Sequence, residues 1–122
     1  LRRSRSRALW PPGDPLELEG FELHQGVSVS GADASALPLC DQGGLGWWRP
    51  WGSQGGSVAG TYLHGVFENG PWRRRWLNQL RQRRALPPLS ESQPHHGRQR
   101  EELLDRLAEA FEAHVNLAPL LE

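Results

Sequence analysis

The chain has 122 residues, and its 14 basic and 14 acidic residues give a formal charge of zero. A neutral chain has no overall field to attract nucleic acid or a charged membrane surface, and no apolar run reaches the roughly 18 residues of a membrane span. The single cysteine, Cys40, excludes an internal disulfide. We expect a cytoplasmic domain, or part of one. Because the chain starts at Leu1 and contains no Met, we expect a fragment or a processed piece.

Residues 1–15 are predicted to form an Arg/Pro-rich linker or a break edge, separate from a domain over residues 16–122. Their Arg-rich run leads into a Trp-Pro-Pro-Gly-Asp-Pro segment, and proline fixes φ and removes a backbone donor. The Arg–Ser alternation is also compatible with an RNA-binding tail. All the basic residues of the chain are Arg, however, which weakens inferences from Arg clusters. We therefore favour a solvated loop.

Three segments follow along the chain. Residues 16–24 alternate between apolar and polar, which predicts a half-buried strand with a possible bulge at Gly20. Residues 25–57 show no sustained period and are predicted to be a long loop, whose three tryptophans are interpreted as local packing. Residues 57–63 are β-branched and aromatic, and they predict a buried strand that ends at His64.

Two helices are predicted after this strand. Asn69 or Gly70 caps the first, and Pro71 starts it, because proline's missing N–H costs nothing at that position. It runs to about Arg84, with an aromatic and leucine stripe for packing on a sheet. The second spans residues 98–115 and also has an apolar stripe. Between them, the adjacent histidines at 95 and 96 have too few neighbouring ligands for a metal site.

His64 is the position that most suggests chemistry. It is predicted at the end of a strand, where open α/β sheets gather their ligands. Histidine titrates near neutral pH and can therefore move protons. From the pattern alone, a structural histidine is the favoured interpretation.

Two motifs carry a resemblance to a known family. The segment 60–69, Gly-Thr-Tyr-Leu-His-Gly-Val-Phe-Glu-Asn, resembles the G-T-Y-L-H-G-hydrophobic-F-x-N segment of cobyric acid synthases. The segment 20–26, Gly-Phe-Glu-Leu-His-Gln-Gly, is similar to their G-Y-E-I-H-x-G segment, and residues 98–117 resemble their closing helix. The motifs favour this family over the related cobyrinic acid a,c-diamide synthases. The implied fold is the C-terminal portion of an α/β class I glutamine amidotransferase-like (flavodoxin-like) domain.

The resemblance implies an enzyme with two activities. A glutaminase domain frees ammonia from glutamine. A synthetase domain, expected outside this chain, uses ATP and Mg²⁺ to convert four carboxylates of adenosylcobyrinic acid a,c-diamide to amides on the route to cobalamin. We expect no cofactor, metal, nucleic acid or membrane partner for the chain itself.

In this family His64 is expected to be the base for a cysteine nucleophile. That cysteine precedes the first motif, so Cys40, which follows Pro38 in a region without a helical pattern, is expected to be a packing residue. We therefore expect the chain to be inactive alone and to aggregate. Many class I glutaminases place Glu two residues after the histidine to orient its ring. Val66 stands there instead, which leaves open what orients His64.

Three further residues are expected near the site. Glu22 and His24 either line it or form a hydrogen-bond network at a strand end. Tyr62 is expected on the same side of its strand as His64, packing beneath the imidazole. Two other functions remain open: a non-catalytic basic module that binds acidic partners or RNA, and a degenerate gene remnant.

Overall fold

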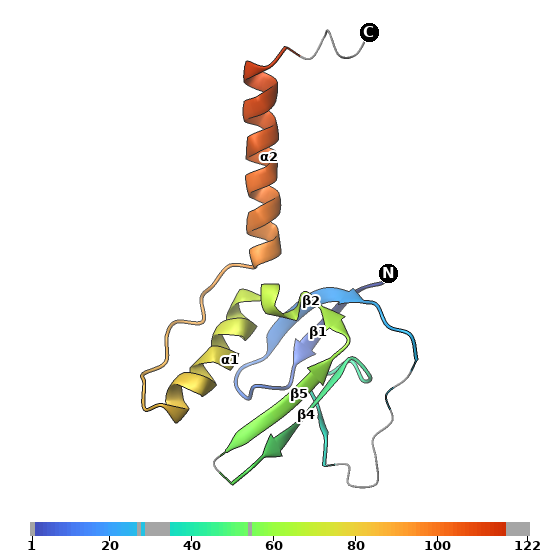
Figure 1. Ribbon diagram of the computed structural model, residues 1–122, viewed down its shortest axis with the longest axis vertical. Helices are drawn as coiled ribbons and strands as arrows, with labels where there is room; N and C mark the ends of the chain where they lie inside the picture. Colours follow the sequence, from blue (N-terminus) through green and yellow to red (C-terminus); the bar gives the residue numbers. More distant parts are fainter. Residues whose placement is uncertain (1, 27, 29–34, 54, 117–122) are drawn as a thin grey trace.

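The computed structural model describes residues 2–26, 28, 35–53 and 55–116, so predictions for the other positions lie outside the described residues. The described part contains two three-stranded sheets, ordered β1-β2-β6 and β3-β4-β5, and two long helices (Figure 1). The elements are β1 Arg2–Ala8, β2 Leu16–Glu22, β3 Leu37–Pro38, β4 Gly46–Trp51, β5 Gly56–Thr61, β6 Leu63–His64, the 3-10 turn η1 Val66–Glu68, α1 Gly70–Arg83 and α2 His96–His114. This is the predicted α/β class, and the described strand pairs are antiparallel.

The first strand corrects the prediction of a loop over residues 1–15. Arg2–Ala8 forms β1, which pairs with all of β2 in an unbroken register from Arg2↔Glu22 to Ala8↔Leu16. Ser4, Ser6 and Ala8 point inward and are at most 8% exposed, while Arg3, Arg5 and Arg7 point outward. The Arg–Ser alternation therefore marks the two faces of a strand. The boundary between residues 15 and 16 remains a prediction.

The predicted strand over residues 16–24 is confirmed as β2, but Gly20 is not a bulge. Gly20 pairs directly with Ser4 inside the continuous register. A Cβ at this position would overlap the carbonyl oxygen of His64 and the side chain of Leu63. A side chain at position 20 would therefore clash with β6, which lies very close to β2 at this point. The two strands pair Phe21 with His64 and Glu22 with Leu63.

The second sheet corrects two further predictions. The segment predicted as a loop contains β3 and β4, and β4 pairs with β5 along its whole length. The predicted buried strand over residues 57–63 is broken at Tyr62, where the chain leaves one sheet and enters the other. The Tyr62 N–H donates to the Leu45 carbonyl, 2.8 Å away. β5 is largely exposed, since four of its six residues are exposed and the other two are half-buried.

Tryptophans join the two sheets to the first helix. The Trp10 ring stacks on Trp48 of β4 with 5.6 Å between centroids, and it meets Trp72 of α1 edge-on at 6.4 Å. The Trp72 indole N–H also donates to the Trp10 carbonyl at 2.8 Å. Trp48 thus packs as expected, whereas Trp51 is 57% exposed beneath the guanidinium of Arg49.

The predicted α1 is confirmed, and its N-cap residue Asn69 also ties the helix to β2. The Asn69 side chain accepts from the Glu19 N–H at 2.8 Å and donates to the Glu19 carbonyl at 2.9 Å. It is 3% exposed, so these bonds form away from water. The buried face of the helix contains Trp72, whereas Leu77 and Leu80 are more than a third exposed.

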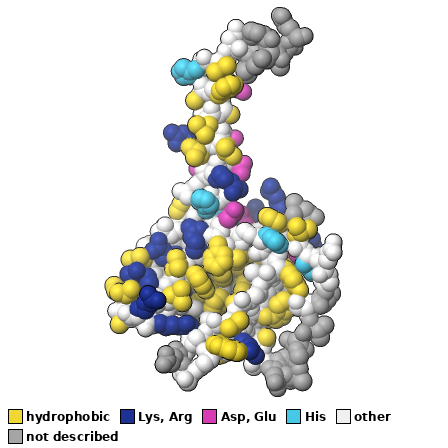
Figure 2. Space-filling view, in the orientation of Figure 1, with side chains coloured by type: hydrophobic (Ala, Val, Ile, Leu, Met, Phe, Trp, Pro, Cys, Tyr) yellow, Lys and Arg dark blue, Asp and Glu magenta, His cyan; other side chains and the backbone are white. Residues whose placement is uncertain are grey.

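The predicted second helix is confirmed as α2, and it projects away from both sheets (Figure 1). Its apolar side chains run along the projecting column in Figure 2 and are exposed. At its base, the Arg98 guanidinium contacts Glu19 of β2 at 2.6 Å and lowers the pKa of that carboxyl. His95 caps the helix by accepting from the Arg98 N–H. Within the described residues, neither helix is long and apolar enough to cross a membrane.

Candidate functional site

His64 lies at the end of β6, held by β2 on one side. Its imidazole stacks on the ring of Phe21 with 5.1 Å between centroids and 11° between planes. Its Nε2 lies 3.2 Å from the Leu23 carbonyl oxygen. These two contacts answer the question of what orients the ring in the absence of a glutamate at position 66.

The Leu23 contact also sets the tautomer of His64. A carbonyl oxygen can only accept a hydrogen bond, so Nε2 must carry the hydrogen. In the neutral ring, Nδ1 then holds the lone pair, and no described side chain or backbone group contacts this atom through a hydrogen bond. In that neutral form, the exposed imidazole presents an unprotonated nitrogen, as a general base requires.

The turn after His64 is shaped by Gly65. Its φ of 80° lies in the left-handed region, which glycine adopts without strain. The chain then forms η1 and reaches Asn69, which is fixed to Glu19 of β2. Both sides of the His64 strand end are therefore anchored to the same strand, and this limits movement of the ring.

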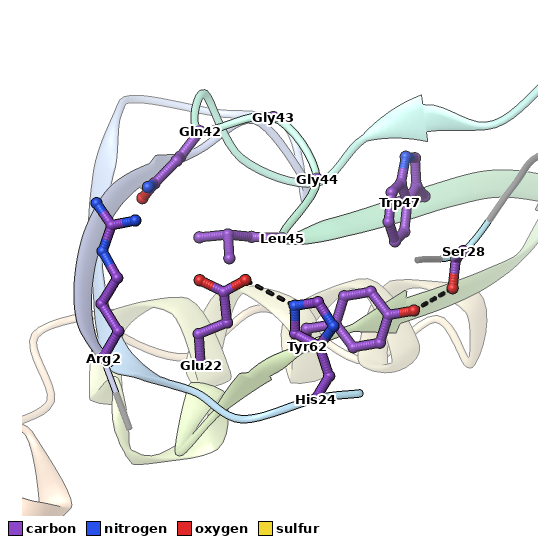
Figure 3. A pocket seen from close by; sticks show the side chains of 10 residues that line it. All are labelled: Arg2, Glu22, His24, Ser28, Gln42, Gly43, Gly44, Leu45, Trp47 and Tyr62. Carbon is purple, nitrogen blue, oxygen red and sulfur yellow. Dashed lines mark hydrogen bonds and ion pairs between the residues drawn. The ribbon is translucent and has the colours of Figure 1, made fainter. Parts of the chain in front are cut away.

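Glu22, His24 and Tyr62 come together in a second cluster (Figure 3). His24 Nε2 donates to Glu22 Oε1 at 2.7 Å, and His24 Nδ1 donates to the Gly26 carbonyl at 2.8 Å. The His24 ring stacks on Tyr62 with 4.0 Å between centroids, and the Tyr62 hydroxyl bonds to that of Ser28. The strand-end network expected for Glu22 and His24 is therefore present.

This arrangement favours the charged form of His24. Both of its ring nitrogens face acceptors, and only the imidazolium has a hydrogen on each nitrogen. The hydrogen bond to Glu22, followed by that to the Gly26 carbonyl, raises the pKa of His24 above its ordinary value of 6.5. The charged form has no free lone pair on either ring nitrogen, so His24 is poorly suited to accept a proton.

The expected packing of Tyr62 beneath His64 is wrong. Strict alternation would place both side chains on one face, but the chain bends at Tyr62 between the two sheets. Tyr62 stacks instead on His24 and meets Trp47 edge-on at 5.9 Å. His64 pairs with Phe21, whereas Glu22 faces the other side of β2, so the imidazole and the Glu22–His24 cluster lie on opposite faces.

The cluster forms one wall of a cavity of about 280 Å³. Its lining residues are Arg2, Glu22, His24, Ser28, Gln42, Gly43, Gly44, Leu45, Trp47 and Tyr62. His64 is not among them. Sequence reasoning missed Arg2, because it was assigned to a linker, and also missed residues 42–47. The alternation of Arg with Ser was the available signal for Arg2, whereas no local pattern marks residues 42–47.

The described part of the chain offers neither an accessible thiol nor a metal cluster. Cys40 is 1% exposed, packs in the core beside Ala8 and donates its S–H to the Gln42 carbonyl. Its assignment as a packing residue remains a prediction that this burial supports. No group of three or more His, Cys, Asp or Glu among the described residues is arranged to hold a metal ion.

Comparison with known proteins gives one consistent family. The chain is 63% identical to the cobyric acid synthase of Synechococcus sp. strain CC9311 and 61% identical to that of strain WH7803, each over 99% of the chain. It is 54% identical to the cobyric acid synthase of Parasynechococcus marenigrum strain WH8102 over its whole length. No family model and no solved structure matches it. The chain belongs to the cobyric acid synthases, and it spans 24% of the length of these relatives.

Proposed function

We propose that the chain supplies the glutaminase base of a cobyric acid synthase, and that this base is His64. The observation that carries the proposal is one contact of the ring: His64 Nε2 lies 3.2 Å from the Leu23 carbonyl oxygen, so the neutral ring leaves Nδ1 able to accept a proton at an exposed strand end. The family motifs around residues 20–26 and 60–69 support the same role, as do relatives up to 63% identical.

In the proposed reaction, His64 Nδ1 accepts the proton of a cysteine thiol that lies outside this chain. The thiolate attacks the side-chain amide carbon of glutamine, and the C–N bond breaks as Nδ1–H protonates the departing ammonia. Backbone N–H groups near the nucleophile stabilise the oxyanion. Water then hydrolyses the thioester to glutamate, with His64 again accepting a proton.

The ammonia would serve an amidation elsewhere in the longer protein. We propose adenosylcobyrinic acid a,c-diamide as the acceptor, with ATP and Mg²⁺ acting in a separate synthetase domain. The amidotransferase-like fold is part of this proposal, since the α/β class is common to many functions.

The test is a His64→Ala variant of the full-length enzyme. Glutamine-dependent amidation should fall by at least about a hundredfold, the range for loss of a general base. Amidation with added ammonium chloride should change much less, because free ammonia bypasses the glutaminase step. Equal losses with both nitrogen donors would show that His64 is not the glutaminase base.

A further inference from the structure

The cavity beside His24 contains two opposite charges that do not neutralise each other. We propose that Arg2 and Glu22 bind the α-carboxylate and the α-ammonium group of glutamine and so select a free amino acid. The inference rests on the proposed function and assigns the residues that determine its specificity.

The register places Arg2 and Glu22 side by side. They are direct partners across β1 and β2, so their side chains leave the same face of the sheet. Neighbours of opposite charge on paired strands often form an ion pair. Arg2 and Glu22 do not, and the Arg2 guanidinium has no ion-pair partner among the described residues. Figure 3 shows it at the cavity wall beside Gln42.

Glu22 is held apart from Arg2 by His24. Its Oε1 accepts from the His24 ring at 2.7 Å, which fixes the direction of the carboxylate. Its Oε2 accepts no hydrogen bond from a described residue. The same contact with Oε1 raises the pKa of His24, so the ring favours its charged form beside this carboxylate. A fixed carboxylate oxygen and an unpaired guanidinium therefore flank the same space.

A zwitterionic amino acid can bind to the Arg2 guanidinium and the Glu22 carboxylate at the same time. Its carboxylate matches the planar fork of an arginine, and its ammonium group can donate to Glu22 Oε2. A volume of about 280 Å³ is near the lower end of the range for ligand cavities, so it suits a single amino acid and is too small for a corrin. Leu45, Trp47 and Tyr62 supply apolar walls for the methylene groups.

The same short segment links the cavity to His64. The side chains of Glu22 and His24 line the cavity, and the carbonyl of Leu23 between them holds the His64 ring. Because His64 lies on the other face of β2, the proposal requires the amide of glutamine bound at Arg2 and Glu22 to pass around the end of that strand. The segment would therefore position both the substrate and the base.

The experiment measures steady-state glutaminase kinetics of the full-length enzyme with Arg2→Gln and Glu22→Gln substitutions. Each variant should raise the KM for glutamine at least about tenfold, the loss expected for one charged contact, with a much smaller change in kcat. Wild-type enzyme should prefer glutamine to 4-carbamoylbutanoate, which lacks the α-ammonium group. Glu22→Gln should lose most of that preference, whereas Arg2→Gln should retain it.

The matched control is Arg5→Gln on the same strand. The Arg5 side chain is 80% exposed and pairs with Glu19, outside the cavity lining. Its KM for glutamine should stay within about twofold of wild type, since exposed ion pairs contribute little. A similar KM increase in all three variants would show a nonspecific effect and overturn the assignment.

His64→Ala separates failure of this inference from failure of the proposed function. If His64→Ala abolishes glutamine use while Arg2→Gln and Glu22→Gln leave the KM unchanged, the cavity assignment is wrong and the function stands. If wild-type enzyme does not hydrolyse glutamine, calorimetry with L-glutamine decides the cavity assignment on its own. Binding that is lost in Arg2→Gln supports it, and absent or unchanged binding contradicts it.

Discussion

Two histidines near the end of β2 differ in the groups that their ring nitrogens face. His64 faces one carbonyl and keeps a free nitrogen, while His24 faces a carboxylate and a carbonyl. The first arrangement suits a neutral base, and the second favours an imidazolium. The two residues are of the same type, so the difference arises from the groups that surround each ring.

The charge on His24 can be tested by titration. The pKa of His24 is raised above 6.5, so its contribution to stability should be fully present below about pH 6.5 and should be lost as the pH rises through the folded pKa. NMR of the His24 ring should show a midpoint above 6.5. Glu22→Gln should lower that midpoint, because the hydrogen bond to the Glu22 carboxylate contributes most to the raised pKa of His24. An unchanged midpoint would exclude the Glu22 contact.

At the scale of elements, one asparagine fixes where α1 begins relative to β2. The Asn69 side-chain amide forms hydrogen bonds with both the N–H and the carbonyl of Glu19. It also donates to the Val66 carbonyl at 3.0 Å. The same residue borders η1, which follows His64. The position of the candidate base therefore depends on a side chain that is buried and fully bonded.

Asn69→Ala should lower the free energy of unfolding by about 2–4 kcal/mol, because it leaves buried backbone groups of β2 without partners. Asn69→Asp should also destabilise, since it keeps the acceptor for the Glu19 N–H but replaces the donor. Gln82→Ala on the exposed side of the same helix is the control and should stay within about 0.5 kcal/mol. Urea unfolding measures all three. A loss below about 1 kcal/mol in Asn69→Ala would mean that these bonds contribute little.

The elements that could be predicted from the sequence are those with a regular apolar period. Both helices and β2 have such a period, and they form where expected. β1 was missed because its inward face consists of serine and alanine, which carry no apolar signal. β4 was missed because it includes Pro50 and tryptophans on both sides.

The candidate site was predictable only in part, for a physical reason. His64, Glu22 and His24 lie in short motifs, so local sequence singled them out. The cavity instead combines Arg2, the segment 42–47 and Tyr62, which are brought together by strand pairing across the chain. The bend at Tyr62 also separates it from His64, and simple alternation does not reveal such a bend.

At the scale of the whole molecule, α2 is the helix that packs least against the rest of the protein. Its apolar stripe, formed by Leu103, Leu104, Leu107 and Phe111, is more than half exposed along a projecting helix (Figure 2). Contiguous apolar surface of this kind promotes association in water. The chain spans only about a quarter of the length of its relatives.

The isolated chain should therefore self-associate as its concentration rises. A double substitution, Leu104→Glu with Phe111→Glu, should reduce this association by placing charges in the stripe. Arg106→Glu, on the opposite side of α2, is the control and should not reduce it. Sedimentation velocity over a range of concentrations measures the effect. A wild-type chain that stays monomeric at every concentration would contradict the prediction.

The most direct test of the central claim is one distance in a crystal structure of the full-length enzyme with bound glutamine or glutamate. We expect His64 Nδ1 to lie within about 3.5 Å of a cysteine sulfur from outside this chain, the reach of a nucleophile–base hydrogen bond. The Leu23 carbonyl should still hold Nε2. If His64 Nδ1 lies far from every cysteine sulfur, His64 is not the base of the glutaminase.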